Sequence, residues 1–300
     1  CMLRLIFSLL LCWLPLSAIE HINQYEIFTK QYQENDTLFL ISRRFELSGV
    51  TFYLTTNTQT LQTKVRSLDP LKLMPLDENF SKTPFAKQLS AATATYIKGG
   101  ATQGITANDK AIYLSMDLCP SSKKGYESDF IEKLTKQNGK TPIAIALSSA
   151  WKEHHPKEFE ALVNNPLLEI TWVNHTHTHF YDPKLPGRAN FLLHQNTDIK
   201  TEILGLEKTL LEEGITPSVF FRFPGLVADE KLMRELRETY FLIPLGANAW
   251  IAKNEPIQKG SIILIHGNKN EPQGITMMEK KLPEVLKTYR FKPIQEAFVQ

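Results

Sequence analysis

The stretch LLEITWVNHTHTH, residues 167–179, joins an apolar run to three of the chain's eight histidines. The run is short and rich in β-branched and aromatic residues, which is typical of a buried strand. On a helical turn after the strand, His175 and His179 would project from one face, the usual geometry for two ligands of one metal ion. In an extended segment His177 would share that face. The stretch therefore predicts a strand that leads into a metal-binding segment.

Apolar runs of the same kind recur along the second part of the chain, with helical patterns between them. Besides residues 167–173 they are AIYLSM (111–116), TPIAIAL (141–147), SVFFRF (218–223), YFLIPLG (240–246) and SIILIH (261–266). Two of the intervening segments, 127–139 and 198–214, carry an apolar stripe at helical spacing and close on a glycine. Strands that alternate with helices in this way predict an α/β domain with a parallel sheet.

Polar residues stand at the carboxyl ends of these runs. They are Asp117, Asn174, His175, Arg222, Asn248 and His266. Each has an ordinary structural explanation when taken alone, such as a cap, a surface charge or a core histidine with satisfied hydrogen bonds. Because the carboxyl ends of parallel strands point to the same edge of a sheet, active sites are assembled there. The shared placement of these residues therefore predicts one functional site.

The first part of the chain differs from this pattern. Residues 3–16 form an apolar run with one early positive charge, Arg4, and small residues follow it, which indicates a signal peptide over residues 1–18. An uncleaved membrane anchor is the alternative, although the run is shorter than the ~18–20 residues that span a bilayer. Residues 19–105 contain β-rich stretches and a segment rich in Gly, Thr and Ala, so we expect a small β-containing N-terminal region with a linker. The α/β domain is then residues 106–300.

The composition indicates a globular protein: 42% of residues are hydrophobic and 22% are charged. A net charge of +2 supplies no strong basic field, which argues against nucleic acid as a partner. Once the predicted leader is removed, Cys119 is the one cysteine of the chain, so no intramolecular disulfide is expected. Cys119 lies beside no histidine in the sequence, and we expect a packed structural thiol rather than a nucleophile.

Four motifs follow one another along the α/β region. They are SMDLCP (115–120), NHTHTH (174–179), RFPG (222–225) and ILIH (263–266). In this order they resemble the motifs of the polysaccharide deacetylases of the NodB-homology type, carbohydrate esterase family 4, over roughly residues 108–290. The resemblance implies a distorted, incomplete (β/α) barrel that removes acetyl groups from sugar polymers with a divalent metal, usually zinc. It also favours the turn at NHTHTH, which makes His177 a bystander.

The resemblance assigns roles residue by residue. It implies that His175 and His179 are metal ligands and that Asp117 is the base that takes a proton from water. His266 matches the general acid that protonates the leaving amine, and Arg222 matches the arginine that holds the carboxylate of the base. The implied substrate contacts are the backbone N–H of Gly225, an oxyanion donor, together with Asn248 and Trp250.

The sequence departs from the family pattern at two places. The first motif usually has two adjacent aspartates, the second a metal ligand, but here Leu118 takes that position. Either the ion has fewer protein ligands, or Asp117 or Asp129 replaces the missing one, and the Asp-x-Cys form of the motif would mark a subgroup. A further motif of the family, which usually carries an aspartate and a tryptophan, corresponds here to GANAWIAK (246–253), which supplies Trp250 as a wall of the sugar pocket but no acid. His266 is therefore expected to lack its usual carboxylate partner.

These features predict a metal-dependent deacetylase that acts on an N-acetylated envelope polysaccharide, either peptidoglycan or a chitin-like glycan, with Zn²⁺ or another divalent metal. With the predicted leader, the protein would be exported to the periplasm or secreted, with no stable membrane span after cleavage.

Two alternatives have the same fold. One is an inactive polysaccharide-binding relative, in which Leu118 is the inactivating change and Trp250, Phe223 and Tyr181 bind sugar. The other is a metal-independent amidohydrolase. A zinc protease of the His-Glu-x-x-His type is excluded at this site, because Thr176 stands where that motif has glutamate.

Overall fold

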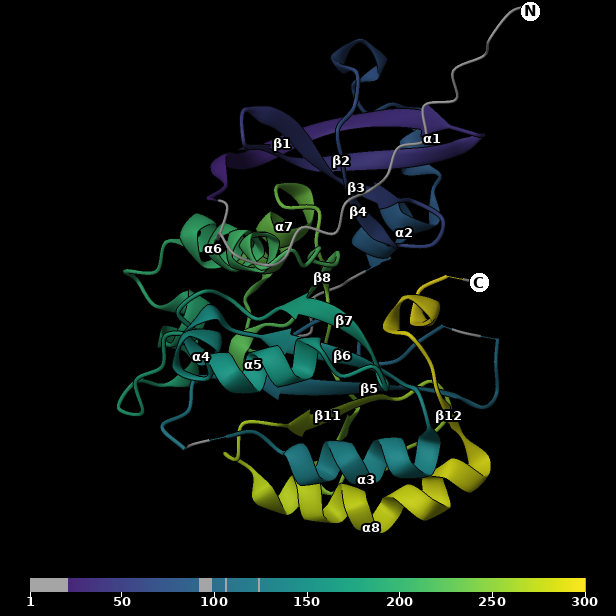
Figure 1. The fold of residues 1–300 in the computed structure, drawn as a ribbon, viewed down its shortest axis with the longest axis vertical. Helices are drawn as coiled ribbons and strands as arrows, with labels where there is room; N and C mark the ends of the chain where they lie inside the picture. Colours follow the sequence, from purple (N-terminus) through teal and green to yellow (C-terminus); the bar gives the residue numbers. More distant parts are fainter. Residues whose placement is uncertain (1–20, 92–98, 106, 124, 300) are drawn as a thin grey trace, which may run out of the picture.

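A computed structural model describes residues 21–91, 99–105, 107–123 and 125–299. The predicted signal peptide, residues 1–18, lies outside the described residues. Figure 1 shows an antiparallel sheet, formed by the N-terminal region, lying above a larger α/β part. Within the described ranges, no helix has both the length and the apolar character that crossing a membrane requires.

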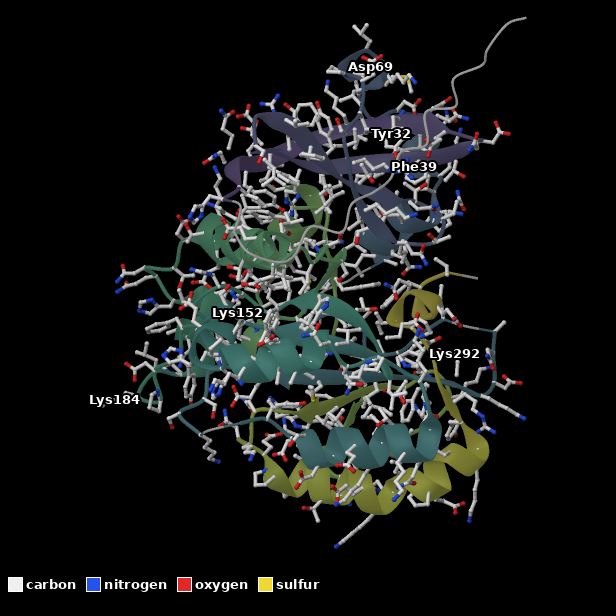
Figure 2. All side chains as sticks on the ribbon, viewed as in Figure 1. Tyr32, Phe39, Asp69, Lys152, Lys184 and Lys292 are labelled. Carbon is white, nitrogen blue, oxygen red and sulfur yellow. The ribbon has the colours of Figure 1, made fainter. Side chains whose placement is uncertain are left out.

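The N-terminal region forms a four-stranded antiparallel sheet in which the strands follow in chain order. Its strands are β1 (Asn23–Glu34), β2 (Thr37–Leu47), β3 (Val50–Asn57) and β4 (Thr63–Arg66). The first two hairpins turn at Asn35-Asp36 and Ser48-Gly49, where both central residues have positive φ, as the tightest hairpin turns require. Tyr32 and Phe39 stack across the first hairpin with their ring centroids 4.9 Å apart (Figure 2).

A parallel sheet forms the centre of the α/β part, with strand order β10-β11-β5-β6-β7-β8-β9 and β12 beside β5. Its strands are β5 (Ala111–Leu118), β6 (Thr141–Leu147), β7 (Leu168–Asn174), β8 (Phe220–Phe221), β9 (Ile243–Pro244), β10 (Ala249–Trp250), β11 (Ile262–His266) and β12 (Arg290–Phe291). Each of the six apolar runs contributes a strand, although β8 and β9 are only two residues long. The predicted incomplete (β/α) barrel, preceded by a β-containing region, is confirmed.

Helices pack against both faces of this sheet and beside the N-terminal sheet. The α-helices are α1 (Glu78–Ser81), α2 (Pro84–Ala91), α3 (Ser128–Asn138), α4 (Ser149–His154), α5 (Pro156–Val163), α6 (Ile199–Glu212), α7 (Glu230–Glu238) and α8 (Pro272–Thr288). The 3₁₀ turns are η1 (Pro70–Lys72), η2 (Gly187–Ala189), η3 (Phe191–Leu193), η4 (Pro224–Leu226), η5 (Ile251–Lys253) and η6 (Ile294–Ala297). Helices α3 and α8 pack side by side below β5 and β11, whereas α6 and α7 lie between the parallel sheet and the N-terminal sheet (Figure 1).

The helix predicted within residues 198–214 is α6, and its sequence explains its limits. The carboxylate of Asp198 accepts hydrogen bonds from the backbone N–H groups of Lys200 and Thr201, which caps the first turn. Gly214, with φ 73°, follows the last turn. The apolar stripe of α6 is buried, so the helix is fixed in place on the sheet.

The central strand β5 separates two cores by simple alternation of its side chains. Leu114, Met116 and Leu118 pack in the cluster that includes α3 and α8. Tyr113 belongs to a second cluster on the opposite side, which contains side chains from α2 and the N-terminal sheet. Because successive side chains point to opposite faces, Asp117 lies on the side opposite Leu118. Leu118 is therefore a core residue, with its side chain turned away from the edge where polar residues gather.

A buried ion pair attaches the N-terminal sheet to α6. Arg43 of β2 donates from Nε and Nη2 to the two carboxylate oxygens of Glu207, at 2.7 and 2.9 Å. The hydroxyl of Tyr25 donates to the same carboxylate at 2.7 Å. Both charged side chains are only 1% exposed. Burial alone would lower the pKa of Arg43, but the Glu207 carboxylate raises it, so the guanidinium stays charged.

Candidate active site and metal centre

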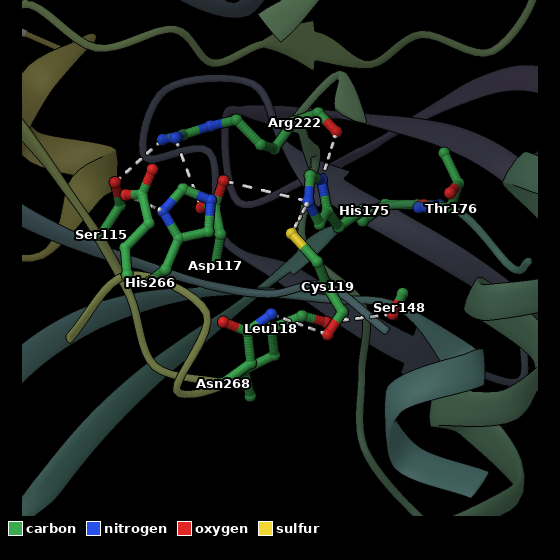
Figure 3. A network of polar contacts seen from close by, with 12 residues as sticks. Ser115, Asp117, Leu118, Cys119, Ser148, His175, Thr176, Arg222, His266 and Asn268 are labelled. Atoms are coloured by element: carbon green, nitrogen blue, oxygen red, sulfur yellow. Dashed lines mark hydrogen bonds and ion pairs between the residues drawn. The ribbon is translucent and has the colours of Figure 1, made fainter. Parts of the chain in front are cut away.

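The register of the sheet aligns the carboxyl ends of its strands. His266 of β11 is the direct partner of Asp117 in β5, and Leu147 of β6 is the partner of Asn174 at the end of β7. His175 follows immediately and donates its backbone N–H to the Leu147 carbonyl at 3.0 Å. Residues from four segments that are distant in the sequence thus meet at one edge, as Figure 3 shows for Asp117, His175, Arg222 and His266.

Two histidines and a cysteine form the core of this cluster. The side chains of Cys119, His175 and His179 each offer one donor atom, and these atoms all lie within 4.8 Å of one another. The Sγ of Cys119 is 3.4 Å from the Nε2 of His175 (Figure 3). The imidazoles of His175 and His179 meet edge to face, with centroids 4.7 Å apart. The thiol that we expected to be a structural group therefore contacts a predicted metal ligand.

The hydrogen bonding and burial of His175 suit a metal ligand. Its Nδ1 donates to the backbone carbonyl of Arg222 at 2.8 Å, which fixes the tautomer and leaves the lone pair of Nε2 facing Cys119. Burial lowers its pKa to about 4, only partly opposed by the charge of Asp117. His175 is therefore neutral at pH 7, the form that a metal ligand needs.

Zinc suits this donor set. A cysteine and two histidines leave one position of a tetrahedral ion for water or substrate, which is the pattern of catalytic rather than structural zinc sites. Burial would raise the pKa of the Cys119 thiol, but the charges and hydrogen bonds of His179 and His266 outweigh it and lower the pKa to about 7. The Nε2 of His179 is buried and makes no hydrogen bond with any residue that the structure describes. A bound cation would satisfy that nitrogen.

Asp117 lies beside the cluster rather than in it. One carboxylate oxygen, Oδ1, is 3.3 Å from Nη1 of Arg222, and the other, Oδ2, is 3.8 Å from Nε2 of His175. The fully buried Arg222 is held in turn by Ser115, whose hydroxyl accepts from Nη2 at 2.8 Å. Asp129, the other proposed replacement for the missing aspartate, is exposed on the first turn of α3 and is not part of the three-residue group.

His266 has a carboxylate partner after all. The Oε2 of Glu271, in the segment between β11 and α8, lies 2.8 Å from Nδ1 of His266 and accepts a hydrogen bond from the indole N–H of Trp250 at 3.0 Å. The expectation that His266 lacks such a partner was wrong, because the acid comes from after β11 instead of beside Trp250. Burial alone would lower the pKa of His266, but the neighbouring Cys119 and Glu271 raise it well above its usual value.

The histidine segment after β7 is a bend and not a helical turn. Thr176 and His179 have φ of 75° and 51°, a backbone that residues other than glycine seldom adopt. Glu202 of α6 holds it: its Oε2 accepts the backbone N–H of Thr178 at 2.9 Å, and its Oε1 accepts the Thr178 hydroxyl. His177 packs against Gly205 of α6, where a Cβ would come within 2.8 Å of its ring.

The substitution Glu202→Ala tests this support. It leaves the part-buried N–H of Thr178 and the buried N–H of His179 without their acceptor, which costs about 1–3 kcal/mol of folding stability. Metal affinity is expected to fall by about 10–100-fold, as for other losses of support behind metal ligands. Lys200→Ala, an exposed change on the same helix, is the control. Urea unfolding and zinc titration are the measurements, and equal zinc affinity in the two variants would contradict the assigned role.

The three predicted substrate contacts lie in different surroundings. Gly225 is exposed in η4 with φ 62°, and a Cβ there would come within 2.6 Å of the Phe191 ring. Trp250 is half-buried, and the ammonium of Lys253 lies 3.5 Å from the centroid of its ring. The Oδ1 of Asn248 is buried without a hydrogen-bond partner. Of the aromatic residues proposed to bind sugar in the inactive alternative, Phe223 is fully buried and Tyr181 is 59% exposed.

No protein-family model matches the sequence. The structure does match solved ones. A family 4 carbohydrate esterase from Bacillus anthracis superposes with a TM-score of 0.52 at 17% identity, covering 71% of this chain and 90% of that chain. PdaA of Bacillus subtilis, also a family 4 carbohydrate esterase, gives a TM-score of 0.52 at 16% identity over 82% of this chain and 94% of that chain.

The chain has the fold of the family 4 carbohydrate esterases. The resemblance read from the four motifs is therefore confirmed for the fold. Three features of the candidate site were not predicted from the sequence: Cys119 as a neighbour of the candidate ligands His175 and His179, Glu271 as the partner of His266, and Glu202 as the support of the histidine segment. Strand alternation could have indicated Cys119, because it stands two residues after Asp117. No local pattern distinguishes the two glutamates.

Proposed function

We propose that this protein is a metal-dependent deacetylase that hydrolyses acetyl groups of an N-acetylated envelope polysaccharide. The observation that carries the proposal is the convergence of two arrangements at one strand edge. One is the Cys119, His175 and His179 group, which has three donor atoms suited to zinc. The other is a base held by an arginine, Asp117 with Arg222, facing a histidine that is paired with a carboxylate.

Zinc held by Cys119, His175 and His179 would polarise the acetyl carbonyl and lower the pKa of a water molecule. Asp117 would accept the proton of that water, a role supported by its contact with Arg222 through Oδ1 and by the position of Oδ2, 3.8 Å from Nε2 of His175. On the neighbouring strand His266 is placed to donate a proton to the leaving nitrogen. The Glu271 carboxylate, 2.8 Å from Nδ1 of His266, favours the protonated imidazolium that this role needs. The exposed backbone at Gly225 is the candidate oxyanion donor.

The substrate belongs to the same proposal. Peptidoglycan and chitin-like glycans carry the N-acetylated sugars that this chemistry requires. The predicted leader over residues 1–18 would place the enzyme outside the cytoplasm, where envelope glycans lie.

Removal and return of the metal tests the proposal. The purified protein is treated with a zinc chelator, its metal content is measured by elemental mass spectrometry, and acetate release from chitopentaose and from peptidoglycan is followed before and after zinc is restored. We expect near-stoichiometric zinc in the untreated protein and a loss of at least about 100-fold in rate after its removal, because Lewis-acid catalysis supplies several kcal/mol. Added zinc should restore the rate.

Two results would contradict this function. Full acetate release after zinc has been removed would favour the metal-independent amidohydrolase. Stoichiometric zinc and glycan binding without any acetate release, on either substrate, would favour the inactive polysaccharide-binding relative.

A further inference from the structure

We infer that Trp250 is a positioning residue for the reaction, because its indole N–H holds Glu271 against His266, the candidate general acid. The resemblance to the deacetylase family implies a different role for this ring, as a wall of the sugar pocket. The inference rests on the proposed function, in which His266 donates a proton to the leaving nitrogen.

A single carboxylate oxygen of Glu271 connects the two rings. Its Oε2 lies 2.8 Å from Nδ1 of His266 and accepts the indole N–H of Trp250 at 3.0 Å. Glu271 stands at the N-cap position of α8, but its side chain makes no capping hydrogen bond with the helix. Because an indole N–H can only donate, the hydrogen bond from Trp250 fixes the direction of the carboxylate. Instead of capping α8, the carboxylate is turned toward the end of β11.

The half-buried ring of Trp250 is already in contact with other parts of the protein. The ammonium of Lys253 lies 3.5 Å from the ring centroid, within the range of a cation–π interaction. The centroid of the ring is 5.8 Å from that of His266. The ring also packs against a small apolar cluster formed by Leu226, Ala247 and Leu264. A sugar stacked on the face that Lys253 covers would have to displace the ammonium.

The turn that follows Trp250 fixes the indole in place. The backbone N–H of Trp250 donates to Oε2 of Glu255 at 2.8 Å, and the backbone N–H of Glu255 donates to the Trp250 carbonyl at 3.3 Å. The residues between them form η5, which packs on α8. The two elements approach closely, because a Cβ at Gly274 of α8 would lie 3.1 Å from the Cβ of Ala252. Trp250 and Glu271 are thus held on elements that pack directly against each other.

The leaving group of the substrate distinguishes a positioning role from a wall. The amine that leaves in deacetylation takes up a proton as the C–N bond breaks, and the nitrogen of His266 that does not face Glu271, Nε2, would supply it. The 4-nitrophenolate of 4-nitrophenyl acetate leaves as a stable anion and needs no such proton. Loss of the indole N–H should therefore slow the release of acetate from a glycan but not from this ester.

The test compares Trp250→Phe, which removes the N–H and keeps an aromatic ring, with Glu271→Ala and with the double variant. Benzothienylalanine at position 250, in which sulfur replaces the N–H, gives the same comparison without a change of shape. The zinc-loaded proteins are assayed with 4-nitrophenyl acetate and with the glycan that the wild type deacetylates, chitopentaose or peptidoglycan. Circular dichroism and zinc content verify that each variant is folded and loaded.

We expect both changes at position 250 to lower kcat for the glycan by about tenfold, the effect of one hydrogen bond to a charged group, with KM and the ester rate within about twofold of the wild type. The double variant should be no slower than Glu271→Ala, because the indole acts through that carboxylate. Trp151→Phe is the matched control. The indole N–H of Trp151 is buried without a hydrogen-bond partner among the described residues, so its loss should change neither kcat nor KM.

The outcomes separate the positioning role from the deacetylase proposal. Wild-type kcat for the glycan without the indole N–H, or equal losses with glycan and ester, would overturn the positioning role alone. A raised KM with unchanged kcat would overturn it in favour of a wall of the sugar pocket, and an additive loss in the double variant would show that the indole does not act through Glu271. If the zinc-loaded wild type releases no acetate from either glycan, the deacetylase is rejected and the positioning role with it.

Discussion

Replacing Cys119 by alanine is expected to lower zinc affinity by more than about 100-fold and to abolish detectable acetate release. The reason is that Cys119 supplies one of three donor atoms gathered within 4.8 Å, and loss of a direct ligand exceeds the 10–100-fold effect of losing a residue that only supports one. His175→Ala should behave in the same way. Cys119→Asp, which restores an anionic donor, should recover part of the zinc affinity, since carboxylates also bind zinc.

Two comparisons make this prediction decisive. His154→Ala removes an exposed histidine and should leave zinc affinity at the wild-type value. Wild-type zinc affinity in Cys119→Ala would show that the thiol is not a ligand, and Asp117, whose Oδ2 is 3.8 Å from His175, would then be the third one. The readout is a competition titration against a chromophoric chelator, run alongside circular dichroism to verify that each variant is folded.

The second large effect is expected at the ion pair between the N-terminal sheet and α6. Arg43→Met removes one partner and leaves the Glu207 carboxylate buried with only the hydroxyl of Tyr25 as a donor. Breaking a buried pair in this way costs about 3–5 kcal/mol, because the remaining charge is uncompensated in a medium of low polarity. Urea unfolding, followed by tryptophan fluorescence, measures the loss.

The neighbouring arginine is a close control. Arg44 pairs with Glu26, but both side chains are more than 40% exposed, at 42% and 44%. Solvent screening limits such a pair to about 1 kcal/mol or less, so Arg44→Met should have a small effect. The double variant Arg43→Met with Glu207→Leu should regain much of the stability, because no isolated charge remains. Equal losses in Arg43→Met and Arg44→Met would mean that the buried pair does not stabilise the attachment of the N-terminal sheet to α6.

The pair of Arg43 and Glu207 also connects the N-terminal region, through α6, to the candidate active site. Glu207 and Glu202 lie on the same helix, α6, where one contacts the N-terminal sheet and the other holds the histidine segment. A helix anchored at Glu207 keeps Glu202 in place below Thr178. Zinc affinity should therefore be measured in Arg43→Met under conditions where this variant is folded. The result shows whether the pair of Arg43 and Glu207 contributes to the metal centre.

The sequence by itself determined the fold class and the edge where the site lies. Apolar runs that alternate with helical stripes require a parallel sheet, and the position of Asp117, His175, Arg222 and His266 at the ends of these runs requires that their side chains meet. These properties depend on local periodicity and on the common direction of the strands, and both can be read from one chain.

Only the tertiary structure decided which groups complete the site. Cys119 reaches His175 because β5 and β7 are brought together through β6, and Glu271 reaches His266 because the chain turns back after β11. Glu202 and Glu207 look like ordinary polar positions of an amphipathic helix, and burial against the histidine segment and against the N-terminal sheet gives them their roles. Such partners are separated from their targets by up to 182 residues, as for Tyr25 and Glu207, and no local pattern encodes contacts of that range.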